Sequence, residues 1–306
     1  VVGEYECGFV LGPRINAAGR MGKSDIGVKL LLESDHEIAV SLAIKLDELN
    51  KQRRSIEQEI TVHATQQAEA QLEENPDLLV LVIADKSYNE GVLGIVAGRL
   101  KELFARPVFV LAVSPDNIAK GSGRSIRSIA LGSLVLAARQ SGILLTGGGH
   151  DMAAGASLHV DKLEEFRAFL AQKISAHIAV LPQREFEITA TNSVAGCTFD
   201  LVRTIESCGP FGSGQPEPTL LLTHISVSQV KWVGTTKSHF TALLDDGTSR
   251  PLKSIMFNVA GTKIGNLLKS VNELGPLKVL GKLKRDEWRG GKSVQFLIED
   301  IARQFD

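Results

Sequence analysis

The chain has 306 residues, of which 43% are hydrophobic and 23% are charged, and its formal net charge at pH 7 is −1. These values are typical of a globular protein of about two domains, and they exclude a globally basic nucleic-acid binder, so any polyanion site must be a local patch. No membrane span or signal peptide is visible, and three cysteines without metal-ligand spacing (Cys7, Cys197 and Cys208) predict reduced thiols in a cytoplasmic protein.

The first motif is GPRINAAGR, residues 12–20. It carries two guanidinium groups and an amide, on Arg14, Arg20 and Asn16, and arginine forks match phosphate oxygens in pairs. We therefore predict that this segment contacts phosphate, with a solvated loop as the alternative. Because the chain starts at Val1 and reaches this motif at once, we interpret it as a piece whose N-terminal part is missing.

Residues 35–74 have apolar side chains at helical spacing, and Asn75-Pro76 ends the pattern. Ser34 and Glu37 are expected to form a capping box at the start of this helix. Forty helical residues span roughly 60 Å. A helix of this length with charged residues on its other faces is typical of a connector between lobes, and a coiled-coil arm is the alternative.

An α/β domain is predicted over residues 76–180. The apolar run of residues 78–84 indicates a strand buried on both faces, as in a parallel sheet. The remaining elements alternate between strand and helix, which favours an α/β fold. We expect helices at 90–100 and 129–140, a strand at 107–112, and a short strand that leads into a helix at 159–177.

Two glycine-rich segments of this domain have anion-binding character. KGSGRS, residues 120–125, places the hydroxyls of Ser122 and Ser125 and the guanidinium of Arg124 beside bare amides, which suits a terminal phosphate, although the spacing is not that of a P-loop. GGGH (Gly147, Gly148, Gly149 and His150) predicts a loop whose N–H groups form an anion nest beside a donating imidazole. A flexible loop and a tight turn that ends in a core histidine are the respective alternatives.

After Pro182 and Gln183 the helical spacing gives way to short alternating segments, which favour a small β-barrel, foremost an OB-fold, with an SH3-like barrel as the alternative. Basic residues interleave with Trp here, as expected for single-strand binding by backbone charge and base stacking. Phe211 is either a buried anchor or a stacking platform. The strands are expected at 220–229, 238–244, 253–257, 277–283 and 293–298. The expected nucleic-acid contacts are Lys231, Trp232, Lys237 and His239, on a positive face with Lys253, Lys282, Lys284, Arg285, Trp288, Arg289 and Lys292; a solvated structural rim is the alternative.

Five motifs occur in one order along the chain: GPRINAAGR (12–20), GVLGIVA (91–97), GSGRS (121–125), GGH with AAG (148–155) and PFGSGQPEP (210–218). Together they resemble the RecJ family, single-strand-specific 5′→3′ DNA exonucleases of the DHH phosphoesterase superfamily, over nearly the whole chain. Two positions depart from the family pattern. Tyr88-Asn89-Glu90 stands where a Trp-His pair is usual, which leaves the role of that loop open, and Gln215 replaces the usual Asn.

The resemblance implies a whole enzyme that degrades single-stranded DNA by metal-dependent phosphodiester hydrolysis in repair and recombination. The family holds Mn²⁺ or Mg²⁺ on Asp and His residues of its DHH domain, whose motifs this sequence lacks, so we expect no cofactor and no activity in this piece alone. The implied layout is the tail of the DHH catalytic domain at 1–34, a long connecting helix at 35–75, a DHHA1-type substrate-binding α/β domain at 76–180 and an OB-fold at 183–306.

By similarity, His150 contacts the scissile phosphate, and the Gly147–His150 loop faces the metal site. The expected partners are single-stranded DNA, a single-strand-binding protein and a helicase, for a monomer that binds no membrane. A DHH-family oligonucleotide or cyclic-dinucleotide phosphodiesterase and an inactive single-strand-binding adaptor are the alternatives. The residues implied to grip the 5′ end and backbone phosphates are Arg14, Asn16, Arg20, Ser122, Arg124 and Ser125.

Overall fold

The computed structural model describes residues 2–176, 178, 185–212, 214–270, 275–286 and 293–304. The chain divides into two compact units, Val1–Arg184 and Glu185–Asp306. Within the described residues, no helix is long and apolar enough to cross a membrane. Trp288, Arg289 and Lys292, which we assigned to the positive face of the barrel, lie outside the described residues, as do Pro182 and Gln183.

The first unit is built on one helix of 39 residues, α3 (His36–Glu74), which confirms the predicted long helix. Its cap is Asp35, whose Oδ1 accepts from the backbone N–H groups of Glu37 and Ile38 at 2.9 and 3.0 Å. The predicted Ser34 capping box is wrong, because the carboxylate one residue later satisfies these free N–H groups.

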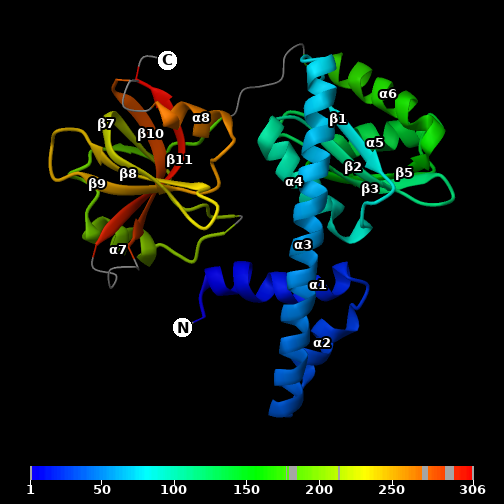
Figure 1. The fold of residues 1–306 in the computed structure, drawn as a ribbon, viewed down its shortest axis with the longest axis horizontal. Helices are drawn as coiled ribbons and strands as arrows, with labels where there is room; N and C mark the ends of the chain where they lie inside the picture. Colours follow the sequence, from blue (N-terminus) through cyan, green and yellow to red (C-terminus); the bar gives the residue numbers. More distant parts are fainter. Residues whose placement is uncertain are drawn as a thin grey trace. The chain divides into compact units, whose positions relative to one another are not determined.

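Three short helices precede α3 along the chain, and two of them pack against its first half (Figure 1). Ala17, Ala18 and Ile26 are buried there against Leu46 and Leu49 of α3, so this end of the unit has a small apolar core of its own. The helices are η1 (Glu6–Leu11), α1 (Gly12–Arg20) and α2 (Asp25–Leu32).

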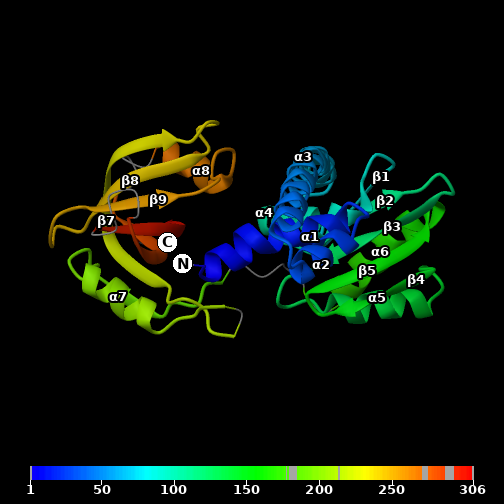
Figure 2. The same ribbon diagram turned by 90° about the horizontal axis from the view of Figure 1, so that it is seen from below.

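A five-stranded mixed sheet in the order β1-β2-β3-β5-β4 packs against the second half of α3. Only β1 and β2 are parallel; the other neighbours are antiparallel. Helices α3 and α4 cover one face and α5 and α6 cover the other, and Figure 2 shows the sheet between α3 and α5. The elements are β1 (Leu81–Asp85), η2 (Glu90–Val92), α4 (Leu93–Phe104), β2 (Val108–Val113), β3 (Ile118–Arg124), α5 (Leu131–Gln140), β4 (Thr146–His150), β5 (Ala153–His159), η3 (Val160–Lys162) and α6 (Leu163–Ser175).

Both glycine-rich segments that we predicted as loops are strands. KGSGR closes β3, and GGGH lies in β4 at the edge of the sheet. The short strand expected to begin at His159 instead ends there, as β5. Glycine is depleted in strands, so local pattern reads these segments as loops. In β4 the close approach of β5 requires glycine, since a Cβ on Gly149 would lie 2.3 Å from the carbonyl oxygen of Ala153.

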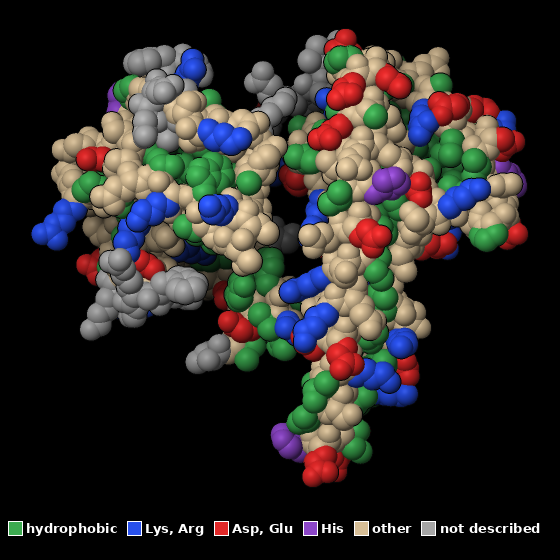
Figure 3. All heavy atoms as spheres, viewed as in Figure 1, with side chains coloured by type: hydrophobic (Ala, Val, Ile, Leu, Met, Phe, Trp, Pro, Cys, Tyr) green, Lys and Arg blue, Asp and Glu red, His purple; other side chains and the backbone are tan. Residues whose placement is uncertain are grey.

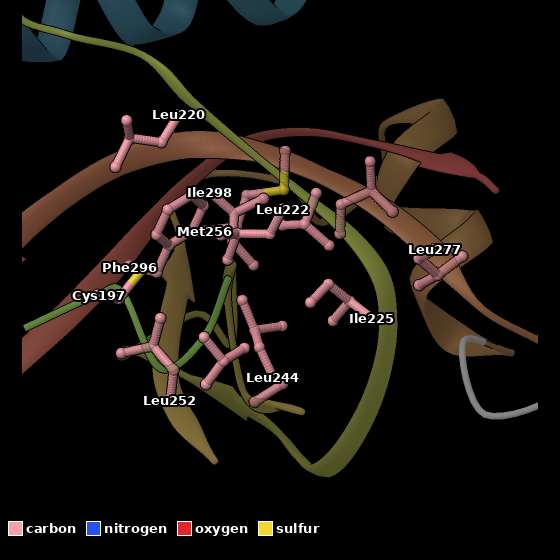
Figure 4. Packing of buried hydrophobic residues seen from close by; sticks show 14 of the residues in the cluster. Cys197, Leu220, Leu222, Ile225, Leu244, Leu252, Met256, Leu277, Phe296 and Ile298 are labelled. Carbon is pink, nitrogen blue, oxygen red and sulfur yellow. The ribbon is translucent and has the colours of Figure 1, made fainter. Parts of the chain in front are cut away.

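The second unit is a closed barrel, which confirms the predicted fold. Strand pairing runs β10-β11-β9-β8-β7-β6, and β10 also pairs with β7 to close it. All five predicted strands are present, and their alternating apolar side chains point into one core (Figure 4). Helices α7 and α8 are additional to the prediction. The elements are β6 (Ala190–Asn192), α7 (Phe199–Ser207), β7 (Leu220–Val233), β8 (His239–Asp245), β9 (Leu252–Met256), α8 (Lys263–Lys269), β10 (Leu277–Arg285) and β11 (Val294–Arg303).

Candidate nucleic-acid interface

A groove of about 890 Å³ lies among η1, α1, α3 and α4 of the first unit. A second hollow of about 510 Å³ shares Ile95 and Arg99 with it and extends to Arg124. We call these two hollows together the arginine groove. Figure 3 shows Lys and Arg side chains grouped along the middle of α3. The charged residues that line the larger hollow are four arginines and one carboxylate: Arg20, Arg53, Arg54, Arg99 and Glu57.

Arg20 and Arg124 come from separate motifs and lie close together beside the start of α4. Arg20 Nη1 donates to the carbonyl of Gly91 at 3.2 Å, and Arg124 Nη1 donates to the carbonyl of Gly123 at 2.8 Å. Burial, and then the positive charge of Arg20, lower the pKa of the Arg124 guanidinium. Neither arginine has a carboxylate partner among the described residues. An anion between them would offset the cost of holding both charges here.

The backbone at the end of α1 and that of η2 are in close contact at this site. A Cβ on Gly91 would lie 1.9 Å from the carbonyl oxygen of Arg20, so only glycine allows this approach. Asn89 caps η2 by accepting from the Gly91 N–H at 2.9 Å, and Glu90 pairs with Lys120 at 2.8 Å. The Tyr88 ring is buried edge-to-face on His63 of α3, 5.6 Å between centroids. The segment that departs from the family pattern therefore holds η2 in place.

One face of the sheet joins Arg124 to the glycine-rich edge strand. The register places Arg124, Ala153 and His150 directly opposite one another on β3, β5 and β4. Residues in one such row point to the same face, and two strand spacings separate the outer two by roughly 10 Å. The next row on that face is Ser122, Gly155 and Gly148. His150, Gly148 and Gly155 are exposed. The two glycines have no side chains, so between Ser122 and Arg124 on one side and the edge strand on the other the surface is bare backbone, which we call the glycine floor.

Two residues that we predicted to grip phosphate have other contacts in the structure. Ser125 is 1% exposed, and its hydroxyl donates to the carbonyl of Ile129 at 2.7 Å. Arg14 donates from Nε to Asp47 at 2.9 Å and from Nη1 to the carbonyl of Val10 at 2.8 Å. Both side chains stabilise local structure, and their contact with phosphate stays a prediction. Asn16, by contrast, is exposed and lines the arginine groove.

In the second unit, the predicted contacts lie at the end of the β7–β8 hairpin. Trp232 is opposite Phe240 and packs edge-to-face on it at 5.8 Å, which places its ring against the core. Lys231 and Lys237 are exposed. His239 packs edge-to-face on Phe257 at 5.1 Å, and Phe257 is 51% exposed. Sequence reasoning did not single out this exposed ring, since its only signal is an aromatic residue at the end of a predicted strand.

Among the described residues, four basic side chains of the predicted positive face form ion pairs with carboxylates that lie far away in the sequence. Lys253 pairs with Asp286, Lys282 with Glu299, Lys284 with Glu217 and Arg285 with Glu206. Among the described residues, Lys231 and Lys237 have no such ion pair. Across all the residues that the structure describes, in both units, no group of three or more His, Cys, Asp or Glu side chains could hold a metal ion.

Comparison with known proteins extends these observations. Residues 75–176 match the DHHA1 domain model and residues 188–300 match the RecJ OB domain model. The chain is 37% identical to the single-stranded-DNA-specific exonuclease RecJ of Dickeya dadantii and 35% identical to that of Escherichia coli, over 97% of this chain and 51% of each relative. The crystal structure of RecJ from Thermus thermophilus in complex with Mn²⁺ matches with a TM-score of 0.80 at 26% identity, over 98% of this chain and 42% of that one.

The chain spans about half the length of the curated relatives that it matches. The DHHA1 model matches the α/β domain, and the RecJ OB model matches the barrel that follows it. These matches confirm the expected fold and the expected family. The chain therefore belongs to the RecJ exonuclease family and carries the DHHA1 and OB domains of its C-terminal portion.

Proposed function

We propose that this chain is the substrate-binding part of an enzyme that degrades single-stranded DNA from 5′ to 3′ by metal-dependent hydrolysis, in DNA repair and recombination. The observation that carries this proposal is the pair of close, uncompensated guanidinium groups of Arg20 and Arg124. A terminal phosphate carries more negative charge than an internal one, so it gains most from two such groups. The relatives of the chain are named single-stranded-DNA-specific exonucleases.

Each of the two units offers its own proposed contacts to the strand. Arg20, Arg124 and Ser122 hold the 5′ phosphate. The Gly148 and Gly155 floor lets the sugar-phosphate chain lie against backbone, and exposed His150 donates to a phosphate oxygen. In the barrel, the free charges and the exposed aromatic pair suit backbone contact and base stacking. The barrel residues are Lys231, Lys237, His239 and Phe257.

We propose that the metal is Mn²⁺ or Mg²⁺, as in the Thermus thermophilus RecJ crystals, and that a DHH domain holds it and supplies the activated water. Residues 1–34 would form the tail of that domain. Exposed apolar side chains on α2 and the start of α3 support this assignment, since they suit a further packed surface (Figure 3). Three free cysteines fit a cytoplasmic protein. On α2 and the start of α3, the most exposed apolar side chains are Val28, Leu31, Leu32, Ile38 and Ile44.

The test compares the binding of 5′-phosphorylated and 5′-hydroxyl oligonucleotides by fluorescence anisotropy. Arg124→Ala should weaken the binding of the phosphorylated strand about tenfold more than that of the other, since a charge-assisted contact is worth at least about 1.4 kcal/mol. Arg127→Ala, which removes an exposed arginine three residues away, is the matched control and should leave the preference unchanged. Equal losses for both strands with Arg124→Ala would reject a terminal-phosphate site.

The hydrolytic part of the proposal needs the whole enzyme. A protein extended N-terminally into a DHH domain should degrade single strands with Mn²⁺, whereas the 306-residue chain should only bind them. Binding by the chain should weaken steeply with salt, because phosphate contacts release counterions. An extended protein that binds single strands and never cleaves them would instead support the adaptor.

A further inference from the structure

A buried carboxylate lies beneath the arginine groove. Glu57 of α3 is 2% exposed and forms ion pairs with two arginines. One is Arg53 on the same helix, which is 7% exposed, and the other is Arg99 on α4, whose Nη2 lies 2.5 Å from Glu57 Oε1. A buried charge is stable only when paired, so Glu57 requires at least one of these guanidinium groups.

The two arginines differ in the donors that they have left. Arg53 is enclosed, and its remaining nitrogens donate to Asn50 Oδ1 at 3.2 and 3.0 Å. Arg99 has a side chain that is 57% exposed, and it lines both hollows of the arginine groove. Arg99 Nη2 forms an ion pair with Glu57 Oε1, an atom that accepts no hydrogen bond among the described residues. A guanidinium has five N–H donors in a rigid fork, so Arg99 presents donors to the groove while it is paired.

A second exposed arginine lines the same hollow. Arg54 follows Arg53 on α3, and it has no ion pair among the described residues. Arg54 and Arg99 lie on the larger hollow, whereas Arg124 lies on the smaller one, and Arg99 is common to both. Arg20 also lines the larger hollow, so the groove carries two further exposed guanidinium groups, Arg54 and Arg99, beside the Arg20 and Arg124 pair.

We propose that Arg99 and Arg54 form a second phosphate subsite, which binds an internal phosphodiester next to the phosphate at Arg20 and Arg124, and that Glu57 positions Arg99 for this contact. The inference rests on the proposed function and adds to it a binding site and a positioning residue. Anchoring Arg99 to a buried group reduces the conformational entropy that it loses when it binds phosphate. Glu57 is itself negative and repels phosphate, so it favours binding only if its positioning of Arg99 outweighs this repulsion.

That condition makes the sign of one substitution decisive. If Glu57 were only a negative charge near DNA, Glu57→Gln would tighten binding, because it removes repulsion. If Glu57 positions Arg99, the same substitution weakens binding. Glu69→Gln, an exposed carboxylate further along α3, is the control for net charge and should bind DNA as well as the unmodified chain does, or slightly better.

The experiment is a double-mutant cycle on the full 306-residue chain, with both kinds of oligonucleotide titrated over a range of salt concentrations. Arg99→Ala should weaken the binding of 5′-phosphorylated and 5′-hydroxyl strands equally, about tenfold, and should lower the slope of log K against log salt by about 1. Glu57→Gln should weaken binding several-fold alone and have no effect in the Arg99→Ala background.

A Glu57→Gln variant that binds as tightly as the unmodified chain, or that weakens binding equally with and without Arg99, would overturn the positioning role. An unchanged salt slope in Arg99→Ala would overturn the subsite. If Glu57→Gln does not fold, Arg99→Lys replaces it: charge is kept and the fork is lost, so binding should still fall, and full binding would refute the proposal. Loss of the 5′-phosphate preference in Arg124→Ala remains a separate readout, so the subsite can fail while the proposed function stands.

Discussion

Replacing Gly91 by Ala tests the close approach of η2 to the backbone of Arg20. The new Cβ would lie 1.9 Å from the Arg20 carbonyl oxygen, whereas ordinary contact begins near 3.4 Å, so the two backbones would have to part by about 1.5 Å. Overpacking of this kind costs about 1–3 kcal/mol. For a unit of this size, 2 kcal/mol corresponds to a fall in melting temperature of roughly 4–8 °C. The same displacement changes the position of Arg20 relative to Arg124, so the 5′-phosphate preference should shrink as well.

Calorimetry and oligonucleotide binding measure the two effects on one variant. Gly98→Ala is the matched control: it lies on α4, nothing is within 4 Å of its added methyl group, and alanine favours a helix over glycine by roughly 0.5–1 kcal/mol. We expect Gly98→Ala to melt at the same temperature as the unmodified chain or slightly above it. Gly98 lines the smaller hollow, so Gly98→Ala controls only for stability. A Gly91→Ala variant that matches Gly98→Ala in melting temperature and the unmodified chain in 5′-phosphate preference would refute this reasoning.

Three further predictions follow from contacts in both units. Phe257→Ala should weaken single-strand binding about tenfold without changing the melting temperature, because its ring is exposed. Trp232→Ala should lower the melting temperature, because its ring packs on the core. A loss of binding only in Trp232→Ala, with a lower melting temperature only in Phe257→Ala, would contradict both assignments. Arg14→Ala should lower the melting temperature and keep the 5′-phosphate preference, and loss of that preference alone would restore Arg14 as a phosphate contact. Burial, and then Asp246, raise the pKa of the Cys197 thiol to about 11, so at pH 8 mass spectrometry should find the two exposed cysteines alkylated and Cys197 protected until unfolding.

The elements with a clear local periodicity could be predicted from sequence. In β8 and β9 every second residue is buried, and α3 buries side chains at helical spacing. Glycine-rich segments could not, because their conformation depends on a neighbour strand that local pattern does not reveal. Gly149 is such a case: Ala154 of β5 lies across from it, and a Cβ at Gly149 would meet the backbone of that strand.

The motifs singled out Arg20 and Arg124, and the structure places them together. The backbone carbonyls that Arg20 and Arg124 contact could not be predicted from composition, and neither could the carboxylates that pair with the barrel lysines. Lys253 forms an ion pair with Asp286, which is 33 positions away, and the sheet order β9-β11-β10 brings β9 and the end of β10 near one another. Ser125 shows the same limit, since a polar residue in a phosphate-like motif is also the residue type that best closes a tight turn through a backbone carbonyl.

The length of α3 has a consequence for how this chain can vary. One end of the helix packs on α1 and α2 and the other end packs on the sheet, with the Asn50, Arg53 and Glu57 contacts between them. Each inserted residue would rotate one core relative to the other by about 100°, the angular step of an α-helix. Single insertions should therefore break either α1 packing or sheet packing. Changes of about a full turn would keep both faces in phase and only lengthen the separation between the two ends.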